Sequence, residues 1–178
     1  MRKVDCDADG LEAAAAVLLS GGVAVIPTDT VYGLAAHPDF PGAVERLYTI
    51  KGREQAKPIA LLAADFDAAS RFVGGIGGKA EEIANERWPG ALTLVVRGEG
   101  LRVPDHEWTR SLLAKCGGLL RVTSANLSGR RPATDAPAAL AEVGLSADVV
   151  VDGGISPGGR PSEVVRVDEA GNVEVLRK

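Results

Sequence analysis

Two polar stretches far apart in the chain hold side chains that suit the binding and activation of a ligand. The first is the PTDT segment, which ends at Thr30 and follows the apolar run Val23–Ile26. The second begins at Ser124 and follows the apolar run Leu119–Thr123. In an open α/β sheet, ligands bind beyond the carboxyl ends of the strands, so both stretches are expected to meet in one cavity. The residues expected to converge there are Thr30, Arg53, Ser124 and Asn126.

Basic residues accompany both stretches and suit an anionic ligand. A helix predicted to begin at Pro41 ends in the cluster of Lys51, Arg53 and Lys57. Guanidinium groups hold two oxygens of a phosphate or carboxylate at once. Lysine and arginine also stabilise helix C-termini and are common on ordinary solvated surfaces. The residues alone therefore leave open that this cluster binds no ligand. A second basic group, near the SAN segment, contains Arg121, Arg130 and Arg131.

The rest of the composition argues against several other kinds of site. The two cysteines, Cys6 and Cys116, are far apart in sequence, as are His37 and His106, so neither a disulfide framework nor a zinc site is predicted. The net charge is −4 and only 4% of residues are aromatic, which disfavours a protein whose whole surface grips nucleic acid. No metal site made by the protein itself is expected.

Length and hydropathy predict one soluble domain. The chain has 178 residues, of which 46% are hydrophobic, enough to bury one sizeable core. The N-terminal MRKVDCDADG lacks the apolar segment of a signal peptide, and no apolar run is long enough to span a bilayer. A cytoplasmic location without membrane attachment is therefore expected.

Short apolar runs alternate with capped helices along the chain and must position the two polar stretches. This alternation predicts an α/β fold, a single domain with a twisted mixed sheet flanked by helices. The other strands expected are Val4–Cys6, Ile59–Ala63, Ala91–Val96, Leu101–Val103, Asp148–Val151, Glu163–Val167 and Val173–Leu176. The other helices expected are Gly10–Ser20 capped by Asp9, Asp65–Phe72, Lys79–Trp88, a helix from its cap Asp105 to Lys115, and Asp135–Val143.

Three motifs resemble those of the YrdC/Sua5 family, the threonylcarbamoyl-AMP synthases. They are PTDTVYGL followed by KGR and KP, then WPGALTLVV at Trp88–Val96, and TSANLSG at Thr123–Gly129. The resemblance extends roughly from Leu11 to Arg177. The chain departs from the family at Arg97–Gly100, where relatives usually carry a longer loop.

The resemblance implies a YrdC-like domain over residues 1–178 and a nucleotidyltransferase activity. The implied reaction forms threonylcarbamoyl-AMP and pyrophosphate from L-threonine, bicarbonate or CO2, and ATP, for the t6A37 modification of tRNA. ATP is then a substrate, and Mg²⁺ is expected to arrive with the nucleotide. A contact with tRNA and a functional link to the threonylcarbamoyl transferase proteins are also implied.

The resemblance assigns roles to individual residues as well. The residues implied to bind threonine are Thr30, Arg102, Ser124 and Ser162. The residues implied to bind ATP are Lys51, Arg53, Lys57, Asn126, Thr134 and Arg177, with Lys51 and Arg53 expected to act in catalysis. Asp29 either assists the magnesium ion or caps its own loop, and both interpretations stay open.

Two other functions compete with this hypothesis. The same fold serves as the carbamoyl-adenylate module of hydrogenase-maturation proteins, which carry extra domains and zinc-finger cysteines that this sequence lacks. A YrdC-like module that binds RNA without catalysis is the non-enzymatic alternative, because a local basic patch binds RNA even on an acidic protein.

Overall fold

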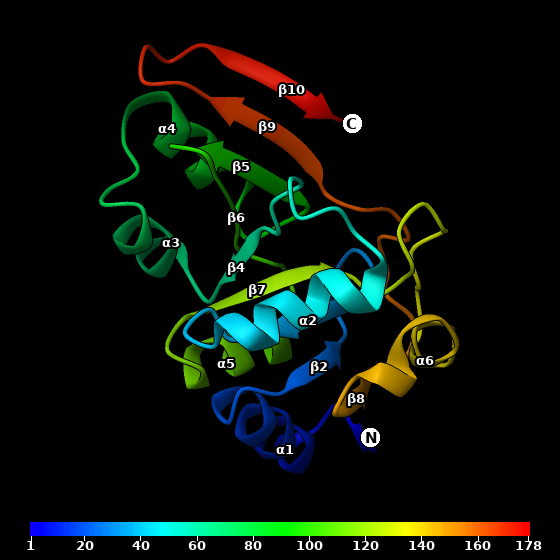
Figure 1. The fold of residues 1–178 in the computed structure, drawn as a ribbon. Helices are drawn as coiled ribbons and strands as arrows, with labels where there is room; N and C mark the ends of the chain where they lie inside the picture. Colours follow the sequence, from blue (N-terminus) through cyan, green and yellow to red (C-terminus); the bar gives the residue numbers. More distant parts are fainter.

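One mixed sheet of ten strands runs through residues 1–178 of the computed structural model (Figure 1). The strands are β1 (Arg2–Asp5), β2 (Val23–Ile26), β3 (Gly33–Ala36), β4 (Leu61–Ala63), β5 (Leu92–Val96), β6 (Glu99–Arg102), β7 (Leu119–Ser124), β8 (Val149–Asp152), β9 (Glu163–Val167) and β10 (Val173–Arg177). The helices are α1 (Ala8–Leu19), α2 (Pro41–Lys51), α3 (Phe66–Phe72), α4 (Gly78–Arg87), α5 (Glu107–Lys115) and α6 (Ala136–Glu142), with a short 3₁₀ helix, η1 (Gly144–Ser146).

The strand order is β1-β8-β2-β3-β7-β4-β6-β5-β9-β10. Neighbours are parallel in the pairs β1–β8, β8–β2, β4–β6 and β5–β9 and antiparallel in the others. The predicted fold class, a single-domain α/β fold with a mixed sheet and flanking helices, is confirmed. None of the helices is long and apolar enough to cross a membrane.

Helices cover both faces of the half of the sheet that contains β2, β3 and β8. On one face, Leu47 of α2 and Ala139 of α6 pack in a buried cluster with Val25. On the other face, Leu18 of α1 and Leu112 of α5 pack against alternate residues of the same strands. The apolar runs of these strands are continuous because both of their faces are buried.

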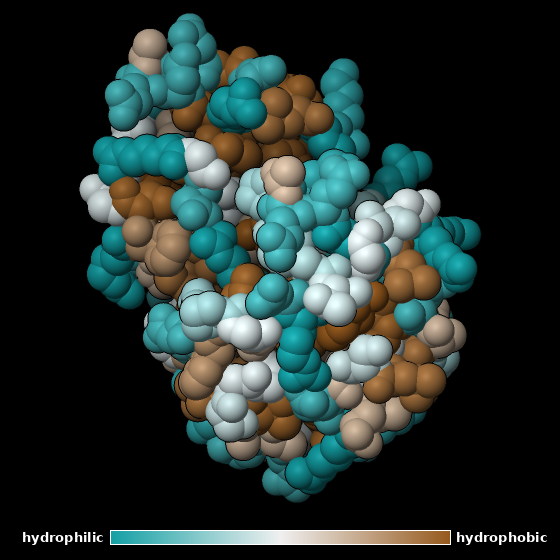
Figure 2. Space-filling view, in the orientation of Figure 1, coloured by the Kyte–Doolittle hydropathy of each residue, from teal (hydrophilic) through white to brown (hydrophobic).

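The other half of the sheet is covered on one face only. Side chains alternate between the faces of a strand, and Leu92 and Leu94 of β5 pack under α3 and α4. Thr93 and Val95 point to the opposite face, where they line a cavity. At the end of this half, β10 is exposed along its whole length, and apolar surface is visible near β9 and β10 (Figure 2). The face that helices leave bare becomes the floor of the candidate site.

The predicted elements are present, with two caps displaced and one strand missed. Helix α1 is capped by Asp7, whose carboxylate accepts a hydrogen bond from the Gly10 amide at 2.8 Å, not by Asp9. Helix α5 is capped by His106, not by Asp105. Strand β3 was not predicted, because glycine and alanine are poor strand formers and its pairing on both sides, with β2 and β7, decides its conformation.

Candidate functional site

A cavity of about 500 Å³ lies against the bare face of β5, β6 and β9. The PTDT loop after β2 and the end of β7 complete its wall. Six of the residues assigned by resemblance line it: Thr30, Arg53, Arg102, Ser124, Ser162 and Arg177. Four others do not line it: Lys51, Lys57, Asn126 and Thr134. Of the four residues expected to converge, Thr30, Arg53 and Ser124 therefore meet in the cavity and Asn126 stays outside it.

The charged side chains that line the cavity are all cationic, and two of them, Arg102 and Arg166, pair with Asp29 and Glu174 outside the lining. Its charged residues are Arg53, Arg102, Arg166 and Arg177, and no aspartate or glutamate is among the residues that line it. Burial, and then the positive charges of Arg102 and Arg53, lower the pKa of Arg177. Guanidinium groups that repel one another in this way favour an anion between them. The arrangement suits phosphate, carboxylate or carbonate groups.

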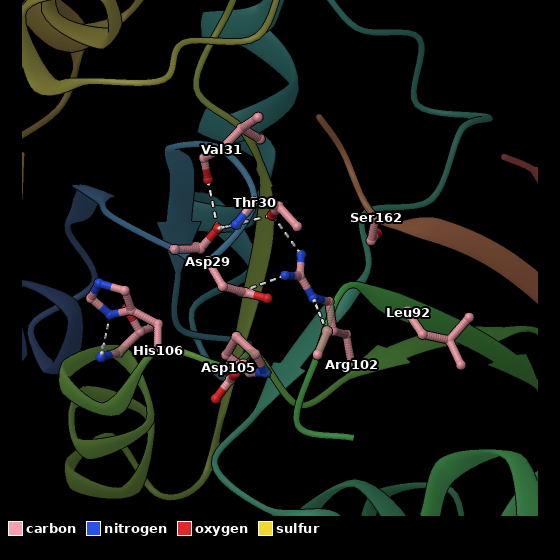
Figure 3. Close-up of polar contacts among 12 residues, drawn as sticks. Asp29, Thr30, Val31, Leu92, Arg102, Asp105, His106 and Ser162 are labelled. Carbon is pink, nitrogen blue, oxygen red and sulfur yellow. Dashed lines mark hydrogen bonds and ion pairs between the residues drawn. The ribbon is translucent and has the colours of Figure 1, made fainter. Parts of the chain in front are cut away.

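Arg102, at the end of β6, is held by three partners (Figure 3). Its Nη1 donates to Thr30 Oγ1 at 2.8 Å, its Nε donates to the Gly90 carbonyl at 2.9 Å, and its Nη2 pairs with Asp29. Arg102 is only 5% exposed, and burial lowers its pKa while Asp29 opposes that effect. The network fixes the guanidinium against Thr30 at the cavity wall.

A second network surrounds Ser162 at the start of β9. The Ser162 and Thr93 hydroxyls lie 2.7 Å apart, and both side chains are buried. Arg177 donates to the Ser162 carbonyl from Nε at 3.0 Å and from Nη2 at 2.8 Å. Sequence reasoning missed Thr93 and Arg166. The sequence pattern that could have revealed them is the alternation of side chains within β5 and β9. In each strand it turns one polar residue, Thr93 or Arg166, away from the apolar core and toward the cavity.

Lys51 lies under the SAN turn rather than in the cavity. It is 3% exposed, and its Nζ donates to the carbonyl of Ser124 and, at 2.6 Å, to that of Asn126. Burial, and then the charge of Arg53, lowers its pKa to about 8. The Asn126 amide donates within the same loop, to the carbonyls of Leu127 and Arg130. These contacts position the turn that carries Ser124.

The remaining assigned residues lie farther out. Lys57 is exposed and pairs with Glu54 at 3.2 Å. The Thr134 carbonyl accepts a hydrogen bond from the Ser156 amide at 2.7 Å. The assignment of Lys57 and Thr134 to ATP stays a prediction.

The second basic group, Arg121, Arg130 and Arg131, lies outside the cavity. Arg121 pairs with Glu99 at 2.7 Å and donates to the Ile59 carbonyl, and Arg130 pairs with Glu142 at 3.2 Å. Acidic residues distant in sequence therefore pair with two of its three members.

Arg53 reaches the cavity because α2 ends sharply. Gly52 adopts a left-handed conformation with φ of 58°, which glycine tolerates without the steric cost of a Cβ atom. The Arg53 side chain then donates to the carbonyls of Lys57 and Pro58, at 3.0 and 3.2 Å. Its guanidinium therefore also orders the loop that leads to β4.

Comparison with known proteins places these features in a family. The model of the Sua5/YciO/YrdC family, described as telomere recombination, matches residues 16–178. The threonylcarbamoyl-AMP synthase of Chromohalobacter salexigens is 34% identical over 171 residues, covering 88% of this chain and 92% of that protein. A putative threonylcarbamoyl-AMP synthase of Mycobacterium leprae is also 34% identical, over 93% of this chain and 81% of that protein.

A solved structure agrees with these relatives. The structure of P. abyssi Sua5 complexed with L-threonine superposes with a TM-score of 0.87 at 27% identity. The match covers 99% of this chain and 56% of that one, so this chain spans about half the length of the Sua5 chain.

Proposed function

Because the chain belongs to the Sua5/YciO/YrdC family, we propose that it is a threonylcarbamoyl-AMP synthase, a nucleotidyltransferase. It forms threonylcarbamoyl-AMP and pyrophosphate from L-threonine, bicarbonate or CO2, and ATP. Its product supplies the threonylcarbamoyl group of t6A37 in tRNA. The bond between carbamate and phosphate in this product is an activated anhydride, so a transferase must consume it. We therefore propose a functional link to such transferase proteins. We also propose a contact with tRNA and a cytoplasmic location.

One observation carries this proposal: four arginines and no carboxylate line the cavity. The triphosphate, the threonine carboxylate and bicarbonate are all anions, and such a lining stabilises each of them. A cavity of about 500 Å³ lies within the range of small-molecule sites. An enzyme that must hold several anions together needs this excess of positive charge.

The residues that line the cavity suit this reaction without a covalent enzyme intermediate. The threonine amine bonds to the carbon of CO2 and loses a proton to solvent, which gives a carbamate. A carbamate oxygen then bonds to the α-phosphorus, and the bond to the pyrophosphate oxygen breaks. Arg53, Arg102 and Arg177 supply positive charge to substrates and leaving group, and they lower the pKa of the threonine ammonium so that more of the amine is neutral. Positioning and electrostatics are the main contributions of the protein.

Magnesium fits this scheme as part of the nucleotide substrate. No group of three or more His, Cys, Asp or Glu side chains lies close enough together to hold a metal ion. Asp29, the acidic group nearest to Thr30 in sequence, is already paired with Arg102. We propose that Mg²⁺ enters with ATP, held by phosphate oxygens and water.

Pyrophosphate release tests the proposed function. The purified protein is assayed with ATP, bicarbonate and L-threonine together, and then with each omitted in turn. Release is expected only when all three are present. Release that does not depend on threonine, or binding of RNA in a salt-dependent manner without any release, would support a different function.

Arg53→Ala is expected to lower threonine-dependent pyrophosphate release by about one to two decades. The variant removes a charge-assisted phosphate contact worth roughly 1.5–3 kcal/mol. Arg53→Lys keeps the charge but loses the planar fork, and it should recover only part of the rate. Steady-state rates are measured beside the thermal midpoint of each variant.

The thermal midpoint separates catalysis from folding in this experiment. Arg53 is partly exposed and bonds only to carbonyls of its own loop, so Arg53→Ala should leave the midpoint nearly unchanged. Full activity in the alanine variant, or a fall in midpoint that accounts for the lost rate, would make Arg53 a structural residue. Lys79→Ala is the matched control, because that side chain is basic, exposed, paired with a nearby glutamate (Glu82) and outside the cavity.

A further inference from the structure

Thr28 is a buried threonine, 3% exposed, with all of its hydrogen-bonding capacity occupied. Its hydroxyl donates to the Val31 carbonyl at 2.7 Å and accepts from the Thr30 amide at 3.2 Å. Its Oγ1 also lies 3.0 Å from Thr30 Oγ1. A hydroxyl has one proton to donate and two lone pairs that accept.

The direction of the bond between the two hydroxyls follows from this count. The single proton of Thr28 is committed to the Val31 carbonyl, which can only accept. Thr30 must therefore be the donor in the contact between the hydroxyls. Thr30 Oγ1 also accepts from Arg102, which leaves it one free lone pair and no free proton.

The cavity thus presents an acceptor beside a cation. Thr30 lines the cavity, one lone pair of its Oγ1 has no protein partner, and Arg102 lies next to it. The three protein partners of Arg102 use three of the five N–H groups of its guanidinium. An amino acid complements this pair, because its amine donates N–H and its carboxylate accepts.

We propose that Thr28 is a positioning residue that holds the Thr30 hydroxyl as an acceptor for an N–H of the substrate amine. This inference rests on the proposed function. The amine nitrogen must keep its lone pair free to bond to CO2. A Thr30 hydroxyl that donated to the amine would occupy that lone pair, whereas an acceptor hydroxyl orients the amine and leaves the lone pair available.

Thr28→Val tests the inference, because valine keeps the shape of threonine and removes the hydroxyl. The Thr30 hydroxyl then has no acceptor on residue 28 and can donate its proton to the lone pair of the substrate amine. The kcat for threonine-dependent pyrophosphate release should therefore fall about tenfold, the effect of roughly one hydrogen bond. The KM for ATP should change less than twofold, since Thr28 makes no contact with the groups assigned to ATP. Thr28→Ser retains the hydroxyl and should restore kcat to within twofold of the wild type.

A second substrate identifies the group that Thr30 binds. The amino acid 2-aminobutyrate has the same amine and carboxylate as threonine but no β-hydroxyl. If the amine is the donor, Thr28→Val should lower kcat by the same factor with both substrates. An effect confined to threonine would assign the contact to the β-hydroxyl and overturn the inference.

Thr109→Val is the matched control for loss of a buried hydroxyl. Thr109 is fully buried and donates to the Pro27 carbonyl at 2.7 Å, but it does not line the cavity. Its variant should lower the thermal midpoint as Thr28→Val does and keep kcat within twofold.

The outcomes separate this inference from the proposed function. A wild-type protein without threonine-dependent release overturns both. Normal wild-type release with an unchanged kcat in Thr28→Val, or no recovery in Thr28→Ser, overturns the inference alone.

Discussion

Arg102→Met is expected to lower pyrophosphate release by about two to three decades and to destabilise the fold by about 3–5 kcal/mol. The variant leaves the buried Asp29 carboxylate, whose side chain is 11% exposed, without its cation. It also removes the donor that holds Thr30 Oγ1 in place, and the positive charge expected to hold the substrate carboxylate. Steady-state kinetics and urea unfolding measure the two effects.

The double variant Asp29→Asn/Arg102→Met separates stability from catalysis. Neutral residues replace both charges, so no unpaired charge stays buried, and most of the lost stability should return. The activity should remain low, because the cation at the cavity wall is still absent. Recovery of activity together with stability would show that Arg102 acts only on folding.

Lys51→Met is expected to destabilise the protein by about 1–3 kcal/mol, because it removes the donor to two carbonyl groups, of which only that of Ser124 keeps another donor, the Asn126 amide at 2.9 Å. These are the carbonyls of Ser124 and Asn126, which the Lys51 ammonium now bridges. The loss should be visible as a lower urea midpoint at pH 7. If Lys51 contacts only ATP, the midpoint should instead stay constant while the KM for ATP rises.

The pH dependence of this loss follows from the lowered pKa. Burial, and then Arg53, brings the pKa of Lys51 from 10.5 to about 8 in the folded protein. Between about pH 8 and 10.5 the unfolded chain binds a proton that the folded protein has released, so the wild type gains stability relative to Lys51→Met as the pH rises. Below pH 8 the difference between the two proteins should be constant.

Unfolding free energies at pH 7, 8, 9 and 10 measure this difference. Other groups with altered pKa values, such as Tyr32 and Cys116, titrate in both proteins and cancel. A difference that is constant up to pH 10 would contradict the lowered pKa.

Local sequence determined most of the scaffold. Helix α3 begins after its predicted cap Asp65, and α6 begins after Asp135, the residue at which the predicted helix starts. In each case the aspartate carboxylate accepts a hydrogen bond from the amide three residues on. Both polar stretches follow apolar strands, and this was sufficient to predict that Thr30 and Ser124 share a cavity. These features depend on interactions between residues close in the chain or on the general geometry of open sheets.

Tertiary structure decided which charges face the ligand. Lys51 and Arg53 are two residues apart, yet Lys51 bonds to the carbonyl of Ser124, 73 residues away, while Arg53 lines the cavity. Arg121 pairs with Glu99 outside the cavity, whereas Arg166 lines the cavity from β9 and pairs with Glu174 of β10. Whether a cation is free depends on the groups within a few ångströms of it in space, and strand pairing between distant segments sets those neighbours.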